Sequence, residues 1–217
     1  MRSALFFALL ALIGPTIRWA AANPIALQCG EPSALIAETV NIAVHKRQSV
    51  VTGKYSFRVV DDGCPHFVDE SLTIKVPVIV RDRQSLAALK SSTAVTVTFG
   101  RRTLHPVSAS MDSPLYDLPA GWKLCFFHCE IPRPAFQSVF MIALRYNQPH
   151  LPGNLVPYYP IHPPERWAPK SAVRYSLEES GSLSLVSKGE RVFEIQPTRL
   201  SIQPQHHKLI LVRVNKS

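Results

Sequence analysis

Apolar and polar residues alternate with a period of two over much of the chain, and this pattern restricts the fold more than any other feature. The longest example is an apolar series at positions 72, 74, 76, 78 and 80, with Pro77 on the opposite face. A period of two places successive side chains on opposite faces of a β-strand. Because proline cannot donate a backbone hydrogen bond, Pro77 indicates an edge strand or a bulge. Further strands are predicted at 40–44, 49–60, 93–99, 122–129 and 138–146.

The last fifty residues are typical of a β-meander. Short, evenly spaced apolar segments occur at 171–178, 182–187, 190–196, 198–203 and 207–214, with glycine or proline between several of them. Regular short strands with such turns favour a sandwich or a barrel. The 19 prolines in 217 residues argue against a helical bundle or a doubly wound α/β fold, and 46% of apolar residues argues against full disorder.

One short helix is predicted near 82–91. Asp82 or Ser85 can cap it, and Leu86 and Leu89 lie on one side. We therefore predict an all-β fold, an immunoglobulin-like or related β-sandwich with this one short helix.

Residues 1–22 are typical of a secretory signal peptide. A basic Arg2 precedes ten apolar residues at 4–13, and small alanines at 20–22 precede Asn23. The apolar stretch is too short for a membrane span, which takes about 20 residues, although Ile17 and Trp19 could extend it into an uncleaved anchor. We expect cleavage, export to the periplasm, the cell surface or the extracellular medium, and no stable membrane span afterwards.

The remaining chain divides into three parts. Residues 23–148 are predicted to form the main sandwich domain, and 149–169 a loop or linker rich in proline and aromatic residues. Residues 170–217 would be only marginally stable alone, because they are few and include no cysteine. We expect this C-terminal meander to pack on the main domain or to complete its sheets.

The loop at 149–169 contains the candidates for ligand binding, which are Tyr158, Tyr159, Arg166 and Trp167. Aromatic side chains make rigid contacts from loops, and Arg166 beside Trp167 could bind an anion or stack on the ring. Such a loop would recognise a glycan or a protein. The alternative is a connector stiffened by proline, with its aromatic rings packed onto the sandwich.

Four cysteines remain after cleavage: Cys29, Cys64, Cys125 and Cys129. An even number in an exported protein indicates two disulfides. If 122–130 is a regular strand, Cys125 and Cys129 lie about 13 Å apart and must pair with the other two. If the chain turns at 126–128, the pairs are Cys125–Cys129 and Cys29–Cys64. We favour the second arrangement, because Cys29–Cys64 would link the ends of the first two strands.

No metal, cofactor or catalytic site is predicted. Cysteine and histidine occur together at 64–66 and 125–129, but the close cysteine pairs of structural zinc sites are absent. The motifs of α/β-hydrolases, P-loop proteins, zinc peptidases and dinucleotide-binding proteins are also absent. A spatial triad leaves no such motif. We predict that the protein is not an enzyme.

The formal net charge is +9, but no run of basic residues exceeds two. Nucleic-acid binding takes a denser basic patch with aromatic residues between the charges, so no nucleic-acid partner is predicted. The scattered charge indicates a solvated basic surface or, alternatively, attraction to an anionic surface such as acidic glycans or an acidic protein.

The segment 193–214 reads FEIQPTRLSIQPQHHKLILVRV, two apolar strands joined by a turn that begins with Pro197. It resembles a segment of the immunoglobulin-like first domain of periplasmic pilus chaperones. The resemblance implies an immunoglobulin-like sandwich and a bacterial surface-fibre system, in which exported β-proteins exchange strands with partners at exposed sheet edges.

Three hypotheses for the function follow. The first is an exported, non-enzymatic binding or assembly protein, an accessory or adhesive component of a bacterial surface fibre (fimbria). Its partner would be a protein of an envelope or surface assembly, or a glycan. The second is a periplasmic chaperone-like protein that caps partner strands. The third is a secreted hydrolase whose site no motif reveals.

Overall fold

The computed structural model describes residues 33–59, 71–82, 84–111, 118–135, 137–161, 170–188, 190–204 and 209–216. Cys29, Cys64, Arg166, Trp167 and the predicted signal peptide lie outside these ranges. The N-terminal half contains β1 (Ser33–Val44), β2 (Gln48–Val59), β3 (Ser71–Arg81), α1 (Leu86–Thr93), β4 (Thr96–Phe99), β5 (Arg102–Leu104) and β6 (Ser108–Met111). The second half contains β7 (Trp122–Pro132), β8 (Val139–Pro149), β9 (Leu155–Tyr158), β10 (Lys170–Leu177), β11 (Ser182–Leu185), β12 (Arg191–Gln196), β13 (Arg199–Gln203) and β14 (Ile210–Asn215).

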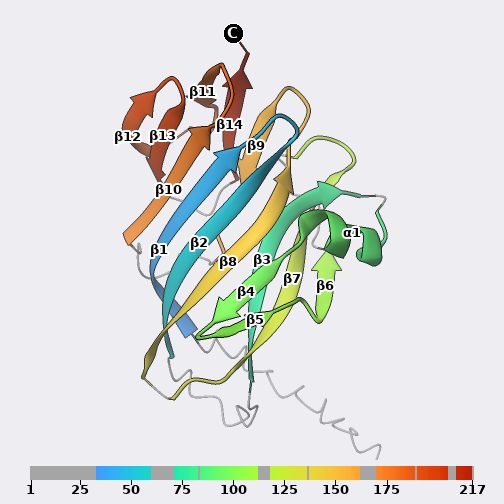
Figure 1. Cartoon of the computed structure of the whole chain (residues 1–217), viewed down its shortest axis with the longest axis vertical. Coiled ribbons are helices and arrows are strands. Elements are labelled where there is room, and N and C mark those ends of the chain that lie inside the picture. The colour runs from blue at the N-terminus through green and yellow to red at the C-terminus, as the bar shows by residue number, and fades with distance from the viewer. Residues whose placement is uncertain are drawn as a thin grey trace, which may run out of the picture.

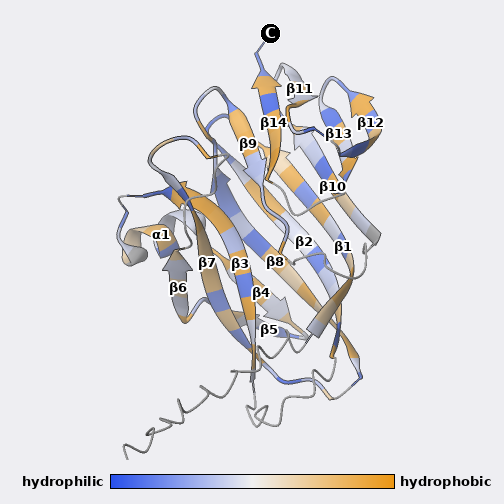
Figure 2. Ribbon diagram, turned by 180° about the vertical axis from the view of Figure 1, so that it is seen from behind, coloured by the Kyte–Doolittle hydropathy of each residue, from blue (hydrophilic) through white to orange (hydrophobic). Residues whose placement is uncertain are grey.

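The strands form one large sheet and two small ones. The large sheet has eight strands in the order β12-β13-β10-β1-β2-β8-β4-β5, and the small sheets have the orders β11-β14-β9 and β3-β7-β6. Figure 1 looks onto the large sheet, and Figure 2 shows the small sheets from the other side. This arrangement confirms the predicted all-β sandwich with one short helix.

The core lies between the large sheet and the two small ones. Alternate side chains of the long strands point inward, as the period of two predicts. Val40, Tyr55 and Leu144 of the large sheet belong to the same buried cluster as Phe127 of β7 and Val212 of β14. Pro77 lies on β3, which is an edge strand of its small sheet, so the predicted edge position is confirmed.

Strands from the two ends of the chain lie next to each other in the large sheet. β10 pairs with β1 in parallel, with Asn41 opposite Arg174, whereas the other strand pairs are antiparallel. Through β10, the hairpin β12–β13 joins the same sheet as the N-terminal strands. The residues 170–217 that the structure describes therefore contribute strands to shared sheets.

The helix is capped by Ser85 rather than Asp82. The Ala88 backbone N–H donates to the Ser85 hydroxyl oxygen at 3.2 Å, and Ala94, whose φ of 46° is left-handed, caps the C-terminal end of α1. No helix within the described ranges is both long and apolar enough to cross a membrane.

Candidate functional site

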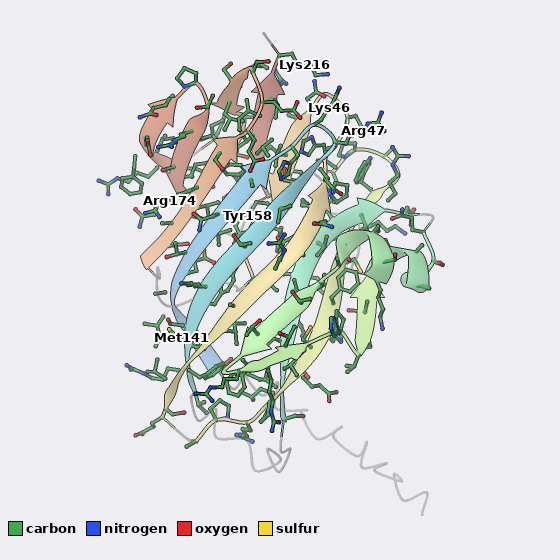
Figure 3. The ribbon with its side chains drawn as sticks, viewed as in Figure 1. Lys46, Arg47, Met141, Tyr158, Arg174 and Lys216 are labelled. Atoms are coloured by element: carbon green, nitrogen blue, oxygen red, sulfur yellow. The ribbon has the colours of Figure 1, made fainter. Side chains whose placement is uncertain are left out.

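The predicted recognition loop at 149–169 contains a strand. Residues 155–158 form β9, which pairs with β14, and Tyr158 is only 1% exposed. The prediction that Tyr158 binds a ligand at the surface is therefore wrong, because the pairing of β9 turns its ring into the core (Figure 3). Tyr159 is half-buried and packs against a small apolar cluster that contains Ile79 and Trp122. Arg166 and Trp167 lie outside the described residues, so their binding role stays a prediction.

Tyr158 belongs to a buried polar cluster around Glu38 of β1. The Tyr158 hydroxyl donates to the Glu38 carboxylate at 3.5 Å, and the Ser171 hydroxyl of β10 donates to its other oxygen. Glu38 is only 4% exposed, so these hydrogen bonds offset the cost of placing a carboxylate in the core. The cluster is closed to solvent and connects β1, β9 and β10 instead of facing a substrate.

Burial also sets the chemistry of four core tyrosines. It is the main cause of the raised pKa values of Tyr55, Tyr146, Tyr158 and Tyr175. The nearby Glu38 carboxylate raises the pKa values of Tyr55, Tyr146 and Tyr158 further. All four rings are therefore held as neutral phenols in the folded protein.

The favoured disulfide Cys125–Cys129 is wrong. Residues 122–132 form one regular strand, β7, without a turn at 126–128, and both cysteines are free and buried. Four residues of strand separate their α-carbons by about 13 Å, far beyond the reach of a disulfide. The pairing Cys29–Cys64 lies outside the described residues and stays a prediction.

We expect Cys125 and Cys129 to resist alkylation in the folded protein. Burial raises the pKa of each thiol to about 11, so little thiolate is present at about pH 8. The test is iodoacetamide labelling before and after denaturation, read on the peptide that contains both residues. Rapid labelling of that peptide in the native protein would contradict their burial.

Two serine–histidine pairs occur that sequence reasoning missed. Ser49 and His150 are joined by a hydrogen bond of 2.9 Å between Oγ and Nε2, although 101 positions separate them. Ser110 and His128 form a second pair at 2.9 Å. No local signal could reveal the first pair, because only the pairing of β2 with β8 brings its members together.

The Ser49–His150 pair does not make a catalytic site. Ser49 is fully buried, so its hydroxyl cannot reach a substrate. Burial lowers the pKa of His150, and His45 lowers it further, so the ring is neutral near pH 7. Within the described ranges neither His150 nor His128 forms an ion pair with a carboxylate, and the one histidine that does is His45, which pairs with Glu178 at 3.2 Å. No group of three metal-ligating side chains occurs there either.

The free edge of β12 is the most unusual exposed feature. Phe193 is 58% exposed and Ile195 76% exposed, on a strand that pairs only with β13 among the described strands. A bulge lies between Val192 and Glu194, and the Arg191 guanidinium lies 5.2 Å from the centre of the Phe193 ring. The orange tip of β12 in Figure 2 shows this apolar end.

The hairpin that presents this edge is held at its turn. The Leu177 N–H donates to the Thr198 carbonyl oxygen at 2.9 Å, and the Leu183 N–H donates to that of Pro197 at 2.8 Å. Both contacts connect the turn to neighbouring strands of the sandwich. The edge of β12 is therefore carried by an anchored hairpin.

No protein-family model matches the chain, and no curated protein is significantly similar to it. Among solved structures, a putative nutrient binding protein from Legionella pneumophila has a TM-score of 0.45 at 10% identity, over 85% of this chain and 68% of that one. Yeast LTA4 hydrolase in complex with bestatin has a TM-score of 0.41 at 9% identity, and the match covers 85% of this chain and 29% of that one. The M1 zinc metallopeptidase of Deinococcus radiodurans has a TM-score of 0.42 at 11% identity, and the match covers 86% of this chain and 43% of that one. The chain thus spans less than half the length of these two enzymes.

Proposed function

We propose that the protein is an exported, non-enzymatic binding or assembly protein that engages a β-rich protein partner along the free edge of β12. The observation that carries this proposal is the exposure of Phe193 and Ile195 on an edge strand. Proteins commonly protect their sheet edges with short strands, charges or prolines, because an exposed apolar edge pairs with other chains.

The opposite edge of the same sheet, formed by β5, differs from the β12 edge in length and in exposed side chains. There β5 has only three residues, and its exposed Arg102 and Thr103 make it a poor template for another strand. β12 has six residues and exposes two large apolar side chains. One edge of the large sheet is thus protected and the other is open to strand addition.

Strand addition explains how such an edge binds. An extended partner segment would complete the backbone hydrogen bonds of β12, and its side chains would contact Phe193 and Ile195. A role as an accessory or adhesive component of a surface fibre fits this chemistry. The resemblance of residues 193–214 to pilus chaperones supports the same kind of system, and capping of partner strands is the second candidate on this edge.

The edge can be tested with the double variant Phe193→Lys/Ile195→Lys. Both side chains are exposed, so the fold should persist while the two charges disfavour strand pairing. The matched control is Val107→Lys, whose side chain is 57% exposed near β6. Wild type and control should capture a β-rich exported subunit from the cell envelope, and the double variant should lose at least about tenfold of this capture.

Hydrogen exchange then locates the contact. In the captured complex, the backbone amides of β12 should gain protection, whereas those of β5 should not. Equal capture by all three proteins, or protection confined to other strands, would contradict the proposal. A refolding assay separates the two roles, because only a chaperone-like protein increases the yield of correctly folded subunit.

A further inference from the structure

The outer face of the large sheet presents a polar row that crosses four strands. Arg174 of β10 lies opposite Asn41 of β1, Asn41 lies opposite Thr52 of β2, and Thr52 lies opposite Arg145 of β8. The inward neighbours of these residues are buried, so this row is the outward set of the alternation. The row therefore runs across the strands on the face seen in Figure 1.

Exposed basic side chains dominate this face. They are Lys54, Arg58, Arg145, Arg174, Arg191 and Arg199. The ion pairs seen among the described residues, His45–Glu178 and Lys123–Asp82, include none of them. Among the outward positions of the described strands in this sheet, the only acidic residue is Glu194 on β12, which accepts a hydrogen bond from Ser201 at 3.1 Å. The face thus carries positive charge that the described part of the protein does not neutralise.

The positions between the basic side chains are small. Thr39 and Ala172 lie opposite each other, and Ala143 lies opposite Lys54. With neighbouring strands about 4.8 Å apart, Arg174 and Arg145 are separated by three strand spacings, about 14 Å. Lys54 lies diagonally from Arg145 at about 7–8 Å between α-carbons. The basic groups therefore stand apart on a shallow surface, with hydroxyl and amide groups between them.

We infer that this outer face binds a linear anionic polysaccharide along the row Arg174–Asn41–Thr52–Arg145. Guanidinium groups pair with carboxylate or sulfate in two-pronged geometry, and Asn41 and Thr52 offer hydrogen-bonding groups for sugar hydroxyls. A chain with repeated charges matches basic groups that recur across the strands. This surface lies on the sheet face and is separate from the β12 edge.

Two other polyanions fit the face less well. Single-stranded nucleic acid binds by stacking its bases on aromatic rings, and β10, β1, β2 and β8 present no aromatic side chain at their described outward positions. An anionic membrane takes a broad apolar face for insertion. The large exposed apolar side chains described on β1 and β8 are Ile36, Val139 and Met141, and Met141 lies near one end of the sheet (Figure 3).

The test compares two triple variants that remove the same charge. The face variant is Lys54→Ser/Arg145→Ser/Arg174→Ser, and the control is Lys75→Ser/Lys188→Ser/Arg213→Ser, which changes exposed residues outside the large sheet. Binding is measured to polygalacturonate and to dextran sulfate over a range of salt concentrations. The face variant should bind at least about tenfold more weakly. The slope of its binding constant against salt concentration should indicate about three fewer counterions released on binding. The control should change less than about twofold.

Several results would overturn the inference. One is an equal loss of polysaccharide binding in both triple variants, which would indicate that binding depends on net charge alone. Another is that the wild type binds neither polysaccharide. Tighter binding to single-stranded DNA or to phosphatidylserine vesicles, lost in the face variant, would assign the face to another class of partner. The variant Phe193→Lys/Ile195→Lys should keep polysaccharide binding, so the two proposals can fail separately.

Discussion

Above pH 10 the protein will lose stability steeply and unfold between about pH 11 and pH 12. The reason is the set of four buried tyrosines, Tyr55, Tyr146, Tyr158 and Tyr175, whose pKa values burial raises above the ordinary value for tyrosine of about 10. A raised pKa in the folded state favours the neutral phenol. The stability from this effect is complete below pH 10 and is lost as the pH rises, because only the unfolded chain then releases the protons.

The expected size of this effect is large. Each pH unit above 10 costs about 1.4 kcal/mol per tyrosine, or about 5–6 kcal/mol for four, while the folded protein keeps them neutral. Two units therefore remove about 11 kcal/mol, which is within the range of total stability for a domain. Tyrosinate absorbance and circular dichroism should change together in one cooperative step.

The variant Tyr175→Phe provides the control. The Tyr175 hydroxyl is buried and has no hydrogen-bond partner among the described residues, so its removal should not reduce the free energy of unfolding at pH 7. It should move the alkaline midpoint upward, because one fewer proton is released on unfolding. Ionisation of all tyrosines near pH 10 with an unchanged circular dichroism spectrum would contradict the prediction.

The substitution Gln148→Leu should destabilise the fold by about 2 to 6 kcal/mol. Gln148 is 2% exposed on β8, and its side-chain amide binds the backbone of Ile79 on β3. The Ile79 N–H donates to the Gln148 carbonyl oxygen at 3.1 Å, and the Gln148 amide donates to the Ile79 carbonyl oxygen at 2.9 Å. Since β3 is an edge strand among the described strands, Gln148 satisfies two backbone groups of β3 that none of those strands pairs with. Leucine fills a similar volume but leaves both groups buried without partners.

Urea unfolding of three proteins would measure this contribution. The control Asn147→Ala changes the next side chain, whose amide makes only an exposed contact of 3.5 Å to the Ser92 carbonyl oxygen, and should stay within about 0.5 kcal/mol of wild type. Gln148→Glu should be destabilised at pH 7, because a carboxylate would face the Ile79 and Pro149 carbonyl oxygens. Its pKa should be raised in the folded state, so stability should return towards about pH 4 and fall again as the pH rises. A loss below about 0.5 kcal/mol in Gln148→Leu would refute the role of this side chain.

The strands and their buried faces could be predicted from the sequence because a period of two reflects the backbone geometry of neighbouring residues. The alternation over 72–80 matches β3, and the Pro197 turn matches the hairpin β12–β13. The site residues were harder to predict. Tyr158 lies in a proline-rich segment, yet β9 forms because it is an edge strand, where Pro157 needs no backbone donor. The prediction of a Cys125–Cys129 disulfide was wrong because the apolar pattern of β7 continues through the expected turn.

By itself the sequence determined the fold class, the edge position of Pro77 and the strands that line the core. Those properties depend on contacts within a few residues or on the chemistry of one residue. Only the tertiary structure decided which distant strands became neighbours: β1 beside β10, Gln148 against Ile79, and Arg174 in one row with Arg145. Strand pairing over long separations is chosen by the burial of the whole core, and no local pattern records that choice.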